Sequence, residues 1–141
     1  MRQSFEAACH EANRLGHNFI RTEHVLLGLL KLAKGSFANL LAKMDLDREA
    51  VRSEVERLVC ASAAHPGNAT LALTPRAQKA VKLAAREAKT LNQPYVTPEH
   101  VFLGLLLEGS GVAALVLQKL GIEIETTREE IRREIHTHPI G

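Results

Sequence analysis

Aromatic residues are scarce in this chain of 141 residues: they make up 4% of the sequence, and tryptophan is absent. Hydrophobic residues nevertheless reach 45%, so the core has to be built mostly from Ala, Leu, Val and Ile. Small aliphatic side chains suit closely packed helices, and this composition argues against wholesale disorder. We therefore predict an all-α fold, either as one compact domain or as two very small ones.

An excess of charge of one sign is also lacking. The chain has 18 Lys and Arg against 16 Asp and Glu, which gives a net charge of +2. Proteins that bind nucleic acid by neutralising phosphates carry more positive charge, so this class is disfavoured. The two cysteines, Cys9 and Cys60, cannot form a framework of several disulfides and fit a reducing compartment.

Long apolar runs and a leader segment are missing as well. The longest apolar stretch, residues 25–33, is interrupted by Gly28 and Lys31. It is far shorter than the roughly 20 residues that a membrane span needs. No basic and apolar leader precedes the Ala-rich start of the chain. We expect no membrane association and a cytoplasmic protein, or one of the plastid stroma if the source is a plant.

Motifs of enzyme chemistry are absent too. The sequence has no Gly-x-x-x-x-Gly-Lys-Ser/Thr phosphate loop, no Gly-x-Ser-x-Gly elbow, no His-Glu-x-x-His and no Cys-x-x-Cys. Its seven histidines do not cluster with carboxylates at the spacing of a metal site. His136 and His138 stand close together, in a tail that we expect to fray. We predict no catalytic residue, no metal and no cofactor for this chain.

The chain does contain a duplication. Residues 15–30 return as residues 91–106, and the Glu-His pairs of the two copies are 76 positions apart. One register kept over about fifty residues is not a chance match. We predict a single domain over residues 1–141, with repeat one at 1–61, a linker at 62–73 and repeat two at 74–138.

Each repeat has the pattern of four helices. Thr74 is a suitable N-cap and Pro75 a suitable first helical residue, and Thr97 and Pro98 repeat this start signal. Gly121 is suited to end the third helix of repeat two. Because the linker is short, we expect the halves to pack as one pseudo-two-fold body. The expected helices span 2–16, 22–33, 36–43 and 47–61, then 76–91, 99–107, 112–120 and 125–136.

Glu23-His24 and its copy Glu99-His100 stand in the first turn of a helix. One interpretation is local: the carboxylate complements the helix dipole, and the histidine caps free backbone N–H groups. The other interpretation is a binding site, because a first-turn carboxylate lies beside unpaired N–H donors. A ligand with both charges would place a guanidinium on the glutamate and a phosphate on the helix start. The residues alone leave both interpretations open.

These same residues carry a family resemblance. The duplicated pattern Leu-Gly-His-Asn-x-Ile-x-Thr-Glu-His-Val-Leu-Leu-Gly-Leu-Leu resembles the Clp repeat domain, the N-terminal module of Clp-type AAA+ unfoldases. The Leu-Thr-Pro-Arg-Ala-x-Lys-Ala-Val that opens repeat two is similar as well, and the ClpC branch is the most similar. The resemblance implies an eight-helix, pseudo-symmetric domain without catalysis. Such a domain docks substrates and adaptor proteins for an ATP-driven unfoldase, with a ClpP-type peptidase downstream.

The resemblance also implies a ligand. In ClpC-like members two pockets bind phosphoarginine, a mark for degradation, and the glutamate of each Thr-Glu-His motif contacts the guanidinium. The matching residues here are Glu23 and Glu99. Arg21 stands where the family has glycine, so its charge either strengthens an anion site or its side chain fills the pocket. The helix-start residues beside the phosphate would be Thr22, Thr97 and Pro98.

Three hypotheses about function follow. In the first, the chain is a monomeric recognition module for substrates or adaptors, which dock with modest affinity at helix starts and grooves. In the second, it is a free-standing accessory protein of the same fold that tunes Clp assembly. In the third, it is a helical nucleic-acid binder that uses Arg128, Arg132 and Arg133. We expect these three arginines to lie on solvated helix faces.

Overall fold

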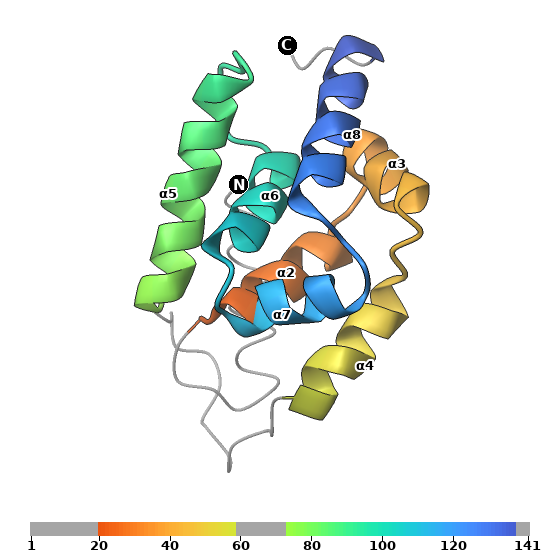
Figure 1. Cartoon of the computed structure of the whole chain (residues 1–141), viewed down its shortest axis with the longest axis vertical. Coiled ribbons are helices and arrows are strands. Elements are labelled where there is room, and N and C mark those ends of the chain that lie inside the picture. Colours follow the sequence, from red (N-terminus) through yellow and green to blue (C-terminus); the bar gives the residue numbers. More distant parts are fainter. Residues whose placement is uncertain (1–19, 59–72, 138–141) are drawn as a thin grey trace.

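The computed structural model describes residues 20–58 and 73–137. The helix expected at residues 2–16 lies outside this description, as do Cys9 and Cys60. The predicted all-α class is confirmed for the described part of the chain (Figure 1). Its seven helices are α2 (Thr22–Lys31), α3 (Gly35–Lys43), α4 (Arg48–Leu58), α5 (Pro75–Thr90), α6 (Pro98–Glu108), α7 (Val112–Lys119) and α8 (Ile124–Thr137).

The duplication of the sequence is also seen in the positions of the helices. The starts of α2 and α6 are 76 residues apart, and so are the starts of α4 and α8. The starts of α3 and α7 follow the same spacing to within one residue. Several predicted boundaries are also confirmed: the Thr74 side chain accepts a hydrogen bond from the N–H of Ala77, and Gly121 follows α7 with a φ of +85°.

The two repeats are interleaved. The third helix of repeat two, α7, packs against α2 and α4 of repeat one, and the third helix of repeat one, α3, packs against α8 (Figure 1). A single cluster of buried apolar side chains runs through both repeats. Within it the Phe37 and Phe102 rings meet edge to face, with centroids 5.7 Å apart, and join α3 to α6. This is the pseudo-two-fold arrangement expected of two repeats in one body.

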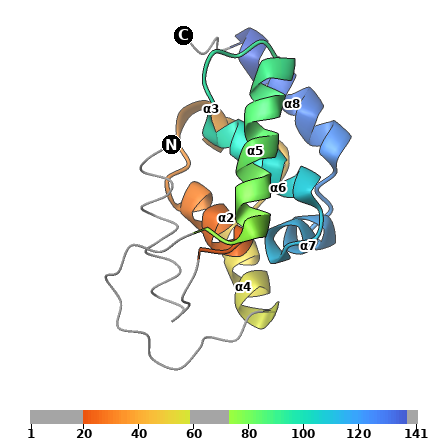
Figure 2. The same cartoon turned by 90° about the vertical axis from the view of Figure 1, so that its left-hand side faces the viewer.

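Helices α5 and α6 approach each other closely, and Figure 2 shows α5 lying across α6. The contact is possible because α6 has Gly104 at the crossing and α5 has Ala80 and Ala84. A Cβ at Gly104 would overlap the carbonyl oxygen of Ala80 and lie 3.0 Å from the backbone nitrogen of Ala84. Small residues at this crossing therefore set the distance between the two helices.

The charged face of α8 differs from the prediction. Arg128 does not lie on a solvated face, because its guanidinium donates to both carboxylate oxygens of Glu87 on α5, at 2.9 and 3.4 Å. Only 19% of the Arg128 side chain and 11% of the Glu87 side chain are exposed. The hydrogen bond and charge of Glu87 raise the pKa of Arg128 above its ordinary value.

The two neighbouring arginines of α8 lie on the solvated face, as expected. Arg132 and Arg133 are exposed, and each pairs with the glutamate three residues before it, Glu129 and Glu130. All three arginines of the nucleic-acid hypothesis thus have glutamate partners, which weakens that hypothesis.

The described helices differ from a membrane span in length and hydropathy. No single one of them is long and apolar enough to cross a membrane. Two consecutive pairs reach the criteria when taken together, α2 with α3 and α6 with α7, but they bend by 108° and 92° at their junctions.

Candidate functional site

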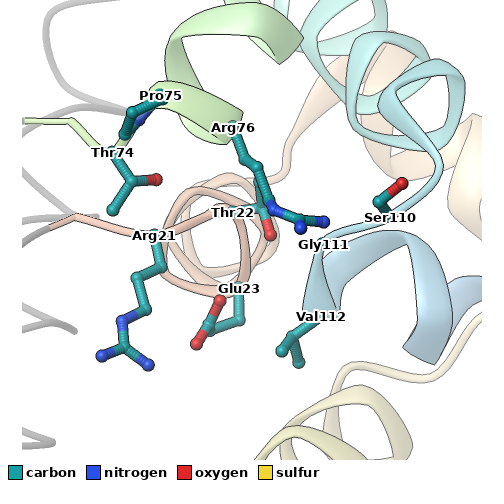
Figure 3. Close-up of a pocket in the computed structure, with 9 residues that line it drawn as sticks. All are labelled: Arg21, Thr22, Glu23, Thr74, Pro75, Arg76, Ser110, Gly111 and Val112. Carbon is teal, nitrogen blue, oxygen red and sulfur yellow. The ribbon is translucent and has the colours of Figure 1, made fainter.

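A pocket lies where the starts of three helices meet, α2 from repeat one and α5 and α7 from repeat two (Figure 3). Its volume is about 410 Å³, which is within the usual range of small-ligand sites. The residues that line it are Arg21, Thr22, Glu23, Thr74, Pro75, Arg76, Ser110, Gly111 and Val112.

Backbone pairing brings the starts of α2 and α5 together. Ile20 and Leu73 form an isolated parallel β-bridge, and the N–H of Thr74 donates to the carbonyl oxygen of Ile20 at 2.9 Å. Arg21 and Thr74 follow directly after these paired residues. The bridge thus aligns two helix starts that are more than fifty positions apart in the sequence and gives the pocket one of its walls.

Two side chains fix the start of α7. The Thr22 hydroxyl of α2 accepts a hydrogen bond from the N–H of Ala113 at 3.3 Å. Glu108, at the end of α6, accepts hydrogen bonds from the N–H groups of Ser110 and Gly111, at 3.1 and 2.6 Å. Glu108 is buried, and both bonds satisfy the same carboxylate oxygen, Oε1. The loop that forms the opposite wall of the pocket is therefore held in place before any ligand arrives.

The charges that face a ligand are mainly positive. Arg21 is exposed, and so is 59% of the Arg76 side chain, whose Nη1 lies 4.0 Å from the Glu108 carboxylate. In Figure 3 the Arg76 guanidinium extends over Thr22 and towards Gly111. The positive ends of three helix dipoles point to the same region. Together these groups make the pocket suitable for an anion.

Glu23 is placed at this pocket as predicted, but its side chain is only 1% exposed. Figure 3 shows its carboxylate on the Arg21 side of α2. A ligand would therefore meet the arginines and the helix starts first and the carboxylate last. The local role of Glu23 in the first turn of α2 and a role in binding a cation both remain compatible with this position.

The other predicted site residues, Thr97, Pro98 and Glu99, form the counterpart region at the start of α6. Glu99 is 5% exposed, and its Oε2 accepts a hydrogen bond from the Ser36 hydroxyl at 3.1 Å. Burial raises the pKa of Glu99, the Ser36 hydrogen bond opposes this rise, and the charge of Glu134 adds to it. The structure therefore divides the six predicted residues into two groups of three.

The contribution of repeat two to the pocket at the start of α2 was not predicted from the sequence. Arg76, Ser110 and Gly111 line it although none of them belongs to a Thr-Glu-His motif. A signal for Arg76 was available, since it follows the Thr74-Pro75 start of α5 and an arginine in a first helical turn is exposed to passing anions. No sequence pattern indicates that this helix start lies beside Arg21.

The two histidines of the motif have the local role that was predicted. Nδ1 of His24 accepts a hydrogen bond from the N–H of Arg21 at 2.8 Å, and Nδ1 of His100 accepts one from the N–H of Thr97 at 2.9 Å. Each histidine thus takes the place that glutamate or glutamine has in a capping box. Over residues 20–58 and 73–137, no group of three or more His, Cys, Asp or Glu side chains could hold a metal ion.

We expect stability to decrease in mild acid because of His100. Burial lowers the pKa of His100 below 6.5, and the charge of Glu87 opposes this only in part. The unfolded chain therefore takes up a proton near pH 6.5 that the folded chain does not bind at this pH. Once protonated, Nδ1 of His100 can no longer accept the hydrogen bond from the Thr97 N–H. The free energy of unfolding should fall as the pH drops below 6.5, by at most about 1.4 kcal/mol per pH unit for one proton.

Urea unfolding between pH 5 and 7.5 measures this effect. His100→Gln keeps an acceptor for the Thr97 N–H but has no proton to take up. We expect its stability to change less than that of the wild type over this range. Parallel pH profiles for the two proteins would contradict the assignment.

Fold and pocket together define a class: a duplicated helical domain with an anion-suited pocket at converging helix starts. A family model, described as the Clp repeat (R) N-terminal domain, matches residues 1–91 and 72–140. The chain therefore belongs to the Clp repeat N-terminal domain family, as the resemblance of its duplicated motif indicated.

Relatives and solved structures agree with this family. The "negative regulator of genetic competence ClpC/MecB" of Bacillus subtilis (strain 168) is 40% identical over 134 residues, which cover 95% of this chain and 16% of that protein. The N-terminal domain of the chaperone ClpD from Arabidopsis thaliana has the same fold, with a TM-score of 0.75, 20% identity and coverage of 96% and 91% of the two chains. The ClpV N-domain, solved in complex with a VipB peptide, has a TM-score of 0.69, 17% identity and coverage of 94% and 82%.

Proposed function

We propose that this chain is a docking domain for protein substrates and adaptor proteins in a Clp-type, ATP-dependent unfoldase that works with a ClpP-type peptidase in the cytoplasm. It contributes recognition and no catalysis. The observation that supports this most directly is the pocket at the starts of α2, α5 and α7. The B. subtilis relative is a Clp protein, and a neighbour of the same fold is a ClpV N-domain in complex with a peptide.

The proposed ligand of this pocket is phosphoarginine on a marked protein. Arg76 offers its guanidinium to a phosphate, and arginine binds phosphate oxygens through two parallel hydrogen bonds. Arg21 adds a second positive charge, from the other side of α2 (Figure 3). First-turn N–H groups other than those of Ala77 and Ala113, which already donate to Thr74 and Thr22, would add donors for the same group. Glu23 is the carboxylate of the pocket and would bind the guanidinium of the ligand.

Modest affinity for one free ligand is consistent with this role. The pocket is open to water on its arginine side, since Arg21 and most of the Arg76 side chain are exposed. Exposed charge pairs contribute little each. In an assembled unfoldase several copies of the domain would act on one substrate, and their combined binding would exceed that of each site.

A titration with free phosphoarginine, followed by NMR and calorimetry, tests the proposal. We expect saturable binding that neither arginine nor inorganic phosphate reproduces. Arg76→Met and Glu23→Gln should each weaken it about tenfold or more, since each removes a charged hydrogen-bonding partner. Arg86→Met, which removes an exposed arginine near the other end of α5, is the matched control and should bind like the wild type.

Arg21→Gly separates the two interpretations of Arg21. Weaker binding would show that Arg21 strengthens the anion site, and tighter binding would show that its side chain fills the pocket. If the wild type binds phosphoarginine no better than arginine and phosphate, the assignment of the ligand is wrong.

A further inference from the structure

We propose that the exposed face of α5 binds an acidic segment of the protein that is docked in the pocket. This face carries a line of cations, which we call the basic stripe of α5: Arg76, Lys79, Lys82, Arg86 and Lys89. The inference rests on the proposed function. It adds to it a preference for phosphoarginine that has acidic residues beside it in the sequence.

The five cations of the basic stripe lie on one side of the helix. They follow one another at intervals of three or four residues, the spacing that places side chains on the same face of a helix. All five residues are exposed. The opposite face of α5 packs on α6 through small buried residues such as Ala80 and Ala84, and Figure 2 shows α5 in front of α6. The stripe therefore points away from the core.

Helix α5 carries more net positive charge than the whole chain. It holds five cations and one acidic residue, a net charge of +4, whereas the chain has a net charge of +2. The remaining residues together therefore have a net charge of −2. The acidic residue, Glu87, is buried and pairs with Arg128, so it does not neutralise the stripe. Positive charge is thus concentrated on one face of one helix.

Four of the five cations have no acidic partner in residues 20–58 and 73–137. They are Lys79, Lys82, Arg86 and Lys89, and the fifth, Arg76, approaches Glu108 only to 4.0 Å. Cations on α3, α4, α7 and α8 do form closer pairs with glutamates. Like charges at intervals of three or four residues repel each other and destabilise a helix. A bound acidic segment would remove this repulsion.

The repeated fold does not require these cations. At the spacing of 76 positions, the buried Ala84 and Ala88 of α5 correspond to Ala8 and Ala12 in repeat one. The four unpaired cations correspond to residues that are neither Lys nor Arg, namely Gln3, Glu6, His10 and Asn13. The sequence thus repeats residues of the buried face but not the basic stripe. This difference is typical of a surface used for binding rather than for packing.

The basic stripe begins at the pocket, because Arg76 is both its first cation and a lining residue of the pocket. From Arg76 to Lys89 the helix axis is about 20 Å long. An extended peptide covers this distance with about six residues. A protein bound through phosphoarginine can therefore contact the whole stripe with residues next to the mark. Free phosphoarginine does not extend that far, so Arg86→Met remains a control for the free ligand.

An acidic protein segment suits the basic stripe better than a nucleic acid does. Binding to nucleic acid depends on many phosphate contacts, which need cations over a broad surface. Here the cations occupy one side of a single helix, and the rest of the chain has a net negative charge. The carboxylates of an extended acidic segment can instead each approach one cation of the line.

Peptides that contain one phosphoarginine test the inference. In the acidic peptides, about six residues before or after the mark include one aspartate for each unpaired cation, and in the neutral peptides asparagine replaces each aspartate. The measured quantity is the ratio of the two affinities, from calorimetry, so that a change in the pocket itself cancels. We expect an acidic peptide to bind the wild type about tenfold more tightly than its neutral counterpart, because several exposed charge pairs each contribute a small amount. Added salt should reduce this ratio.

Two triple variants locate the effect. Lys79→Gln, Lys82→Gln and Lys89→Gln together should reduce the ratio to less than about twofold, because most of the stripe is lost. The matched control combines Lys31→Gln, Arg132→Gln and Arg133→Gln, which remove the same charge from exposed positions on α2 and α8. We expect the control to keep the wild-type ratio. An equal reduction in both variants would show an effect of net charge alone and would overturn the inference.

The remaining outcomes separate the inference from the proposed function. Saturable binding of free phosphoarginine with a peptide ratio near one would overturn the inference and leave the proposed function standing. Duplex DNA that binds more tightly than the acidic peptide, and less tightly to the lysine variant, would assign the stripe to nucleic acid and also overturn the inference. Absence of saturable binding of free phosphoarginine would overturn the proposed function and the inference with it.

Discussion

Gly104→Ala is expected to destabilise the domain by about 3 kcal/mol, at the upper end of the effects of overpacking. The added Cβ would overlap the carbonyl oxygen of Ala80 and lie 3.0 and 3.2 Å from the backbone nitrogen and Cβ of Ala84. These obstacles are mainly backbone atoms of α5, which cannot turn aside as the tip of a long side chain can. The two helices would have to separate, and the packing of α5 on α6 would be lost along its length.

Urea unfolding followed by circular dichroism measures this loss. The double variant Gly104→Ala with Ala84→Gly provides a strict control, because it removes the Ala84 Cβ but leaves both backbone obstacles. We expect no rescue, only the further cost of a glycine within a helix. A Gly104→Ala protein within about 0.5 kcal/mol of the wild type would contradict the close crossing of α5 and α6.

Gly111→Ala is expected to destabilise the domain by about 2 kcal/mol and to abolish the proposed phosphoarginine binding at the starts of α2, α5 and α7. Gly111 is buried, and a Cβ there would overlap the Thr22 hydroxyl and lie 3.0 Å from the Glu108 carboxylate. These are the two groups that hold the start of α7. Displacing them would leave buried donors and acceptors without partners and would move one wall of the pocket.

A double-mutant cycle with Thr22→Ala identifies the cause. Thr22→Ala alone loses the hydrogen bond to Ala113, but it also removes the atoms nearest to the new Cβ. The effects of Gly111→Ala and Thr22→Ala should therefore sum to more than the effect of the double variant. Additive effects would show that Thr22 is not the obstacle.

Much of the fold can be predicted from the sequence. Thr74-Pro75 and Thr97-Pro98 mark helix starts because their side chains and fixed φ angles suit those positions, and the structure begins α5 and α6 there. The duplication also predicts which helices of the two repeats correspond, because a duplicated pattern of apolar residues requires a duplicated fold. Local chemistry also placed His24 and His100 at the helix caps.

Contacts between distant segments could not be predicted in this way. The Ser36–Glu99 hydrogen bond joins residues 63 positions apart, and the Glu87–Arg128 pair joins residues 41 positions apart. Periodicity shows which face of a helix is apolar, but it does not show where that helix crosses another. The interpretation of Arg128 as solvated was wrong for this reason, because a carboxylate of α5 lies opposite the residue.

Both repeats contribute walls to the pocket, α2 from one repeat and α5 and α7 from the other. A protein with a single repeat could complete such a pocket only by pairing with a second copy of itself. The two-fold symmetry of that pair would give it two identical sites, and every substitution would change both. Joining the copies in one chain removes this constraint. Arg21 can then differ from Thr97, and Val112 from Ser36, so that one site changes while the other is preserved.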